Sequence, residues 1–222
     1  MSSDEKIRVM IVEDHFMVRV GLVSIINSQP DMLIVAESKN GLEAVELFAE
    51  VQPDVTLMDL RIPGIDGVKA ISAIMKDYPQ ARIIVISTYG GDEDIFRAMQ
   101  AGARGYFLKH VEAQDLIDAI RAVHAGECRL PPEVASRLVE RMHRSELSPR
   151  EMEVFELIAK GLSNKEIASK LSISEGTVRV HISHLLAKLG CSDRAQAVSE
   201  AFRRGIVHLS DAPANPSSSN GG

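Results

Sequence analysis

The sequence predicts a doubly wound α/β domain with a five-stranded parallel sheet, followed by a small all-α helix-turn-helix domain. Short β-branched runs alternate with segments of helical apolar spacing through residues 1–125. The alternation stops near Gly126, and every periodic segment after Leu147 is helical. A length of 222 residues is sufficient for two domains of this kind.

Five apolar runs in the first 125 residues are typical of buried parallel strands, namely IRVMIV, MLIVAE, DVTLMD, RIIVIS and RGYFLK. Segments with the apolar spacing of helices lie between or after them, at residues 17–27, 41–51, 67–77, 92–101 and 112–124. Five strand-helix units in this length predict one compact domain with helices on both faces of the sheet.

A linker is predicted at residues 126–145, where Pro131 and Pro132 interrupt the pattern and one charged amphipathic helix follows. Residues 146–210 contain four helical segments, and each of them opens on a serine, which is a good N-cap. Three of the four close on glycine. The tail DAPANPSSSNGG, residues 211–222, cannot bury a core and is expected to be disordered.

The formal net charge of −6 is unevenly distributed along the chain. Residues 1–126 hold 12 Lys and Arg against 19 Asp and Glu, whereas residues 145–222 hold 9 of each class. The negative total therefore does not exclude nucleic-acid binding by the second half.

The compartment is predicted from three absences in the sequence. No apolar run approaches the roughly 20 residues of a membrane span, and the start of the chain lacks the basic residues of a secretion signal. Cys128 and Cys191 are far apart, without the spacing of a zinc site or a disulfide framework, so we interpret both as free thiols. We expect a cytoplasmic protein with no membrane partner.

Polar side chains occur where four of the predicted strands end. They are Glu13 and Asp14 after the first run, Asp59 after the third, Ser87 and Thr88 at the end of the fourth, and Lys109 after the fifth. Ligands bind outside the carboxyl ends of parallel strands, so we expect these side chains to converge at one edge. Taken singly, each has an ordinary alternative as a helix N-cap, a loop acid or a solvated lysine.

Three carboxylates gathered at one point suit a hard divalent cation. Mg²⁺ usually takes few carboxylates and keeps oxygens of water and substrate phosphate as its other ligands. An aspartate at such a site is able to act as a nucleophile and form an aspartyl-phosphate. Asp59 lies beside a strongly apolar run, where a carboxylate is costly to bury unless it is paired or bound to a metal. The cluster therefore predicts Mg²⁺-dependent phosphoryl chemistry.

These motifs give the first half a clear resemblance to the receiver domain of two-component response regulators, which has a flavodoxin-like fold. The resemblance covers residues 6–125 and is carried by IVEDH, LMDLRIPGIDG, VISTYG and AGARGYFLKH. It implies that a sensor histidine kinase phosphorylates Asp59. The implied Mg²⁺ ligands are Glu13, Asp14, Asp59 and the backbone carbonyl of Arg61.

The resemblance also implies a switch that responds to the phosphoryl group. Ser87 occupies the position of the switch hydroxyl, since its separation from Lys109 matches the family, and Thr88 is the alternative. Lys109 is the implied phosphate-contacting lysine. Tyr106 resembles the aromatic residue that moves inward when the hydroxyl moves toward the phosphate, although it has an equal alternative as an ordinary core residue.

The segment NKEIASKLSISEGTVRVHISHLLAKLG has the spacing of a helix-turn-helix, with helices at 164–171 and 175–189. An apolar stripe on the second helix predicts its core face, and it consists of Val178, Ile182, Leu185 and Leu189. No acid occurs from Gly176 to Leu189, so the opposite face is suited to phosphates. His181 and His184 are too few ligands for zinc.

The second half resembles the LuxR/NarL-type DNA-binding domain over residues 146–208, through LSPREMEVFELIAKGLSNKEIASKLSISEGTVRVHISHLLAKLG. The resemblance implies base contacts by Arg179, Val180 and Ser183. It implies phosphate contacts by four further residues, namely Lys165, Thr177, His184 and Lys188. The helix at 194–204 is the implied dimer contact on DNA.

The two resemblances together predict a transcription factor of the NarL/FixJ type and not an enzyme. Its expected partners are a sensor histidine kinase, double-stranded promoter DNA and a second copy of itself when active, with RNA polymerase as a possible further partner. Phosphorylation is expected to switch dimerisation or domain exposure, and so promoter binding.

Three alternatives to this prediction remain. Phosphatases with an aspartate nucleophile place a second acid two residues later, where this chain has Arg61. A regulator that binds a small signal molecule is poorly supported, because aromatic residues make up only 4% of the chain. A receiver that works without phosphate is the third alternative, and the complete set of acids, hydroxyl and lysine argues against it.

Overall fold

The computed structural model describes residues 6–144 and 147–206. These form two compact units, of which the first contains residues up to 90 together with 95–138. The second contains residues 91–94 together with 139–144 and 147–206. The tail predicted at 211–222 lies outside the described residues.

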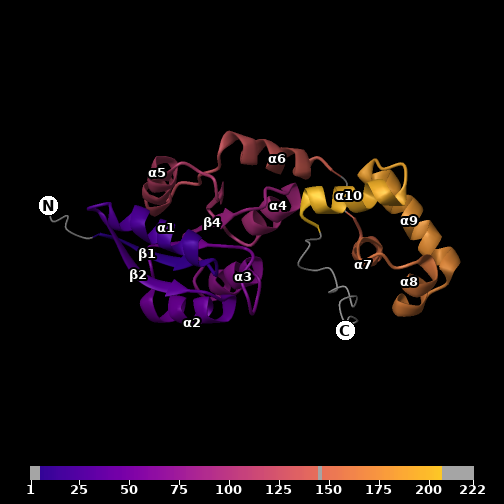
Figure 1. Ribbon diagram of the computed structural model, residues 1–222, viewed down its shortest axis with the longest axis horizontal. Coiled ribbons are helices and arrows are strands. Elements are labelled where there is room, and N and C mark those ends of the chain that lie inside the picture. Colours follow the sequence, from indigo (N-terminus) through magenta and orange to yellow (C-terminus); the bar gives the residue numbers. More distant parts are fainter. Residues whose placement is uncertain (1–5, 145–146, 207–222) are drawn as a thin grey trace, which may run out of the picture. The chain divides into compact units, whose positions relative to one another are not determined.

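The first unit is built on a five-stranded, all-parallel sheet (Figure 1). Its strands are β1 (Ile7–Val12), β2 (Met32–Ser38), β3 (Val55–Met58), β4 (Ile83–Ser87) and β5 (Gly105–Leu108), in the order β2-β1-β3-β4-β5. The three central strands are buried on both faces, because helices cover both sides of a parallel sheet. The predicted doubly wound sheet is confirmed.

The helices of the first unit fall into two groups, one on each face of the sheet. Helices α1 (Phe16–Asn27) and α5 (Ala113–His124) pack in one apolar cluster, which includes Ile11 and Leu57. Helices α2 (Gly41–Val51), α3 (Gly67–Asp77) and α4 (Asp92–Gln100) contribute to the other, which includes Met10 and Met58. Alternate residues of β1 and β3 thus supply opposite cores.

The linker contains one helix, α6 (Pro132–Met142). Its residue Val134 is buried in the same apolar cluster as Met58 and Tyr106, and Leu138 packs against that cluster. Pro132 stands at the first helical position, where the missing N–H has no intrahelical partner to lose.

The helix-turn-helix region consists of α7 (Pro149–Ala159), α8 (Asn164–Leu171), α9 (Glu175–Leu189) and α10 (Arg194–Arg204). Capping boxes start α7 and α8, where the side chains of Ser148 and Ser163 each accept a backbone N–H three residues later. Ser174 caps α9 in the same way. The expected serine cap of α10 is wrong, because Asp193 accepts the backbone N–H of Gln196 instead.

The predicted core face of α9 is confirmed. Val178 packs with residues of α7 and α8, and Leu185 and Leu189 pack with residues of α7 and α10. Ile182 is half-buried against the first of these clusters. The stripe therefore fixes which side of α9 is left for a ligand.

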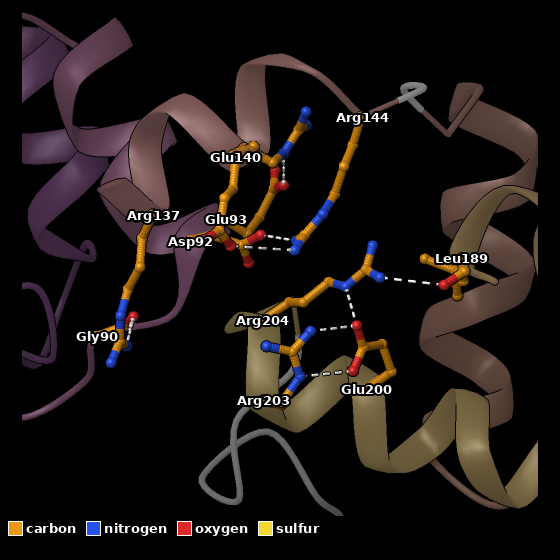
Figure 2. A network of polar contacts seen from close by, with 11 residues as sticks. Gly90, Asp92, Glu93, Arg137, Glu140, Arg144, Leu189, Glu200, Arg203 and Arg204 are labelled. Carbon is orange, nitrogen blue, oxygen red and sulfur yellow. Dashed lines mark hydrogen bonds and ion pairs between the residues drawn. The ribbon is translucent and has the colours of Figure 1, made fainter. Parts of the chain in front are cut away.

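Helix α10 is tied to the end of α9 by charged side chains, as Figure 2 shows. The Arg204 guanidinium donates to the carbonyl oxygen of Leu189, with a distance of 3.1 Å, and Arg203 donates to Glu200. The hydrogen bond from Arg203 lowers the pKa of Glu200 to about 2, against the opposing effect of burial, and Arg204 adds to the decrease. Glu200 therefore stays ionised through the physiological range.

Two smaller expectations concern the cysteines and the membrane. Cys128 is exposed and Cys191 is half-buried, and both are free thiols as predicted. Among the residues that the structure describes, no helix combines the length and the apolar character that crossing a bilayer requires.

Candidate phosphoacceptor site and nucleic-acid interface

Three carboxylates converge at the carboxyl ends of β1 and β3. The two strands are neighbours, with Val12 opposite Met58, so Glu13 and Asp14 are brought beside Asp59. Ligand atoms of these three residues and of His15 all lie within 4.8 Å of one another. Glu13 and Asp59 are almost completely buried, and Asp14 is partly exposed. The structure thus brings the predicted acids together.

Lys109 supplies the counter-charge for the two buried acids. It follows β5, and its Nζ lies 2.7 Å from Oε2 of Glu13 and 2.7 Å from Oδ2 of Asp59. Burial lowers the pKa of Lys109, but the hydrogen bonds to Asp59 and Glu13 outweigh it and hold the pKa above its usual value. The lysine is therefore charged at neutral pH. Its contact with Glu13, in addition to Asp59, was not predicted.

The turn after β3 positions the Asp59 carboxylate. The backbone N–H of Arg61 donates to Oδ1 of Asp59, with a distance of 3.2 Å. A Cβ at Gly67 would lie 2.3 Å from the carbonyl oxygen of Asp59, so only glycine allows α3 to start this close to the site. The role of the Arg61 carbonyl as a metal ligand stays a prediction.

The donor set fits a hard divalent cation. Three carboxylates offer the oxygen ligands that Mg²⁺ prefers, and Asp14 leaves the cluster open to solvent on one side. His15 is a fourth member that sequence reasoning missed, with Nδ1 2.9 Å from Oδ1 of Asp14 and 3.2 Å from Oε1 of Glu13. Its place directly after the two acids was the available signal.

Ser87 and Tyr106 meet at the loop between β4 and α4. Ser87 is fully buried and its Oγ accepts the backbone N–H of Tyr89, at 3.1 Å, whereas Thr88 is exposed. The buried Tyr106 donates its hydroxyl to the carbonyl oxygen of Tyr89, at 2.7 Å. The guanidinium of Arg61 lies over the Tyr89 ring, 5.7 Å from its centroid.

Tyr89 therefore links both switch residues to the phosphoacceptor loop, and sequence reasoning missed it. The signal was an aromatic residue two positions after the switch hydroxyl. The roles of Ser87 and Tyr106 in a switch stay predictions, and Tyr106 is at the same time part of an apolar core.

The predicted DNA-facing side of α9 is exposed. All six candidates on this helix are exposed, namely Thr177, Arg179, Val180, Ser183, His184 and Lys188. Lys165 on α8 is exposed as well. Arg179 is 71% exposed and lies 3.8 Å from Glu175 across one helical turn, which is a weak surface pair. His181 is half-buried, as expected from its place near the core stripe.

Lys188 has a structural partner that the sequence did not reveal. Its Nζ lies 2.7 Å from Oε2 of Glu151 in the first turn of α7, and Glu151 is buried. The hydrogen bond from Lys188 and the backbone N–H of Ser148 lower the pKa of Glu151. The contact of Lys188 with phosphate stays a prediction.

A parallel α/β domain with this acidic cluster, followed by a helix-turn-helix, defines a DNA-binding response regulator. Residues 9–121 match the family described as response regulator receiver domain, and residues 145–201 match the luxR family of bacterial regulatory proteins. The chain therefore belongs to the two-component response regulators of the LuxR family. These are DNA-binding transcription regulators, so the prediction that the chain is not an enzyme is confirmed, and the phosphatase alternative is excluded.

A particular relative is the response regulator protein VraR of Staphylococcus aureus strain NCTC 8325 / PS 47. It is 42% identical over 206 residues, which cover 90% of this chain and 99% of VraR. The chain is thus similar to VraR over both halves.

Solved structures of response regulators are also similar to this chain over both halves. Response regulator ChrA of a heme-sensing two-component system is 37% identical, with a TM-score of 0.55, over 91% of this chain and 99% of ChrA. A complex of the response regulator RcsB with DNA is 26% identical, with a TM-score of 0.68, over 88% of this chain and 98% of RcsB. Another structure contains two RcsB dimers bound to two parallel DNAs.

Proposed function

We propose that this response regulator accepts a phosphoryl group from a sensor histidine kinase on Asp59 and thereby changes its binding to promoter DNA. The observation that supports the proposal most is the buried Asp59 carboxylate at the end of β3, which faces Lys109 within a cluster of acids. Attack by a carboxylate oxygen forms a new bond to phosphorus and breaks the bond from phosphorus to the histidine nitrogen of the kinase.

The residues around Asp59 have separate tasks in this proposal. Mg²⁺, held by Glu13, Asp14, Asp59 and the carbonyl of Arg61, would neutralise charge on the transferring group. Lys109 would move from the carboxylates to a phosphoryl oxygen, since its ammonium carries three donors. The buried hydroxyl of Ser87 would donate to another phosphoryl oxygen. Tyr106, which contacts the loop after β4 through Tyr89, would change the conformation of that loop in response.

The direct test uses the full chain with a small phosphodonor such as acetyl phosphate and with Mg²⁺. Mass spectrometry should detect one added phosphoryl group, which acid or hydroxylamine removes, and peptide mapping should locate it on residue 59. Omission of Mg²⁺ should prevent the modification. A phosphoryl group found on another residue would contradict the proposal.

We further propose that α9 enters the major groove of DNA. Its exposed face carries no acid from Gly176 onward, which suits contact with phosphates, and the similar protein RcsB forms a complex with DNA. Base contacts are assigned to Arg179, Val180 and Ser183. Phosphate contacts are assigned to Lys165, Thr177, His184 and Lys188.

The remaining parts of the proposal concern organisation. The active form is a homodimer in which α10 forms the contact between the two copies on DNA, in line with the RcsB dimers on DNA. RNA polymerase is a further candidate partner, and the cytoplasm is the proposed location. The proposed domain boundaries are a receiver at 1–125, a linker at 126–145 and a DNA-binding domain at 146–210.

Arg179→Ala should weaken binding to DNA fragments selected by the wild-type chain, by about 1 to 3 kcal/mol if the guanidinium contacts a base. The exposed pair with Glu175 is weak, so breaking it to contact a base costs little free energy. Fluorescence anisotropy at fixed salt measures the change. Lys160→Ala is the matched control, because it removes one exposed cation at the end of α7 that is not among the assigned DNA contacts. Equal affinity of the Arg179 variant and the control would remove Arg179 from the base contacts.

Two lysines should respond differently to removal of their charge. Lys165→Gln should lower the slope of log K against log salt by about 1, with an unchanged free energy of unfolding. Lys188→Gln should reduce the free energy of unfolding as well, because the buried Glu151 loses its ion-pair partner. Salt titrations and thermal unfolding measure the two effects. Unchanged stability of the Lys188 variant would show that the ion pair contributes nothing to the fold.

A further inference from the structure

Three arginines occur at positions 137, 141 and 144, with spacings of four and three residues. Arg137 and Arg141 lie one turn apart on the linker helix α6, and Arg144 lies two residues after this helix ends. We call Arg137, Arg141 and Arg144 the arginine face. Figure 2 shows Arg137 at Gly90 and Arg144 at Asp92. The arginine face is thus directed at the loop before α4 and at the first turn of that helix.

Arg137 belongs to the first unit and donates to the carbonyl oxygen of Gly90. A Cβ at Gly90 would lie 2.8 Å from Nη1 of Arg137 and 3.3 Å from Leu108, so a side chain at this position would displace the guanidinium. Within the second unit, Nε of Arg141 lies 2.6 Å from Oε2 of the buried Glu93, and Arg144 pairs with the buried Asp92.

Gly90 directly follows Tyr89. The backbone of Tyr89 forms hydrogen bonds with the side chains of both Ser87 and Tyr106. The carbonyl oxygen of Tyr89 accepts from Tyr106, and the next carbonyl oxygen, that of Gly90, accepts from Arg137. Two consecutive peptide units are therefore fixed by two side chains from different elements. The two contacts therefore restrain φ and ψ of Gly90, which lie between these two planar units.

The conformation held in this way leaves the Ser87 proton available. A serine hydroxyl has one donor and two acceptor positions, and the Oγ of Ser87 uses an acceptor position for the N–H of Tyr89. Its O–H is able to donate to a phosphoryl oxygen while the loop stays in place. The buried position of Tyr106 belongs to the same conformation.

The apolar side of α6 is fixed to the same region. Val134 is buried in the cluster that contains Tyr106, and Leu130 and Leu138 pack against this cluster. Arg137 therefore approaches Gly90 from a helix that is already in place, which reduces the entropy lost when its side chain is ordered.

We propose that α6, through Arg137, holds the loop between β4 and α4 in the form that accepts a phosphoryl group, so that docking of the linker helix promotes phosphorylation of Asp59. Arg137 is a positioning residue in this scheme. By linkage, phosphorylation would in turn strengthen the docking of α6. The inference rests on the proposed function, since it concerns the phosphorylation of the same aspartate.

The test compares the full-length wild-type chain with Arg137→Ala, Arg137→Lys and Arg129→Ala. Arg129→Ala is the matched control, because it removes an exposed arginine of the same linker whose guanidinium pairs with Glu127. Two quantities are measured, namely the initial rate of phosphorylation by acetyl phosphate with Mg²⁺ and the hydrogen exchange of residues 88–91 before phosphodonor is added. Circular dichroism verifies that each variant is folded.

We expect Arg137→Ala to be phosphorylated about threefold to tenfold more slowly, the factor of one exposed hydrogen bond, and to exchange residues 88–91 faster. Arg137→Lys should recover most of both losses, and Arg129→Ala should equal the wild type. An unchanged or increased rate in Arg137→Ala would overturn the inference, whatever the exchange shows. A wild-type chain that accepts no phosphoryl group would overturn the proposed function as well, which distinguishes the two failures.

Discussion

Asp59→Asn should abolish the acid-labile phosphorylation of the chain by a small phosphodonor with Mg²⁺. The amide has nearly the same shape as the carboxylate but lacks its nucleophilic oxygen, and as a neutral group it is a weaker ligand for Mg²⁺. The fold should survive, because the substitution removes one of two acids that share Lys109 and leaves Glu13 as its partner. Intact-protein mass spectrometry measures the loss.

Asp66→Asn is the matched control for this experiment. Asp66 lies in the same loop and caps α3 by accepting the backbone N–H of Lys69, a task that asparagine performs equally well. The control should therefore be phosphorylated like the wild type. Persistent labelling of the Asp59 variant would mean that another residue accepts the phosphoryl group, and the assignment of Asp59 would fail.

The fold was largely predictable from the sequence, because its signals are local. The bounds of α2, α3, α8, α9 and α10 equal the predicted ranges, and those of α1, α4 and α5 differ by one residue at one end. Serine caps, glycine stops and apolar periodicity act within a few residues of each boundary. One predicted cap was wrong. Ser192 was expected to cap α10, but the next residue, Asp193, is an equally good N-cap and takes this role.

The candidate site was predictable only as a set of residues. The carboxyl ends of parallel strands lie at one edge of the sheet, so convergence of Glu13, Asp14 and Asp59 could be expected. The partners of individual side chains depend on loop geometry and on long-range packing. Neither of these produces a periodic pattern that can be recognised in a single sequence. The contact of Lys109 with Glu13 and the position of Tyr89 between the switch residues belong to this class.

The contact between Lys109 and both acids leads to the second large expected effect. Lys109→Ala should lower the free energy of unfolding by about 3 to 5 kcal/mol in the absence of divalent cations, the usual cost of removing one partner of a buried ion pair. Glu13 and Asp59 are 1% and 3% exposed, so the substitution leaves two largely buried carboxylates without their cationic partner. Chemical denaturation measures the loss, and Lys76→Ala, an exposed lysine at the end of α3, is the matched control.

Two further measurements distinguish the effect of the lost charge from the effect of lost side-chain packing. One adds Mg²⁺, and the other adds a second substitution. Mg²⁺ should stabilise Lys109→Ala more than the wild type, because the ammonium no longer competes for Glu13 and Asp59, whose carboxylates the cation would neutralise. Asp59→Asn combined with Lys109→Ala should be more stable than Lys109→Ala alone, since one of the two unpaired buried charges is gone. If neither Mg²⁺ nor the second substitution raises the free energy of unfolding of Lys109→Ala, the loss comes from packing of the lysine stem. The electrostatic account of the site would then be wrong.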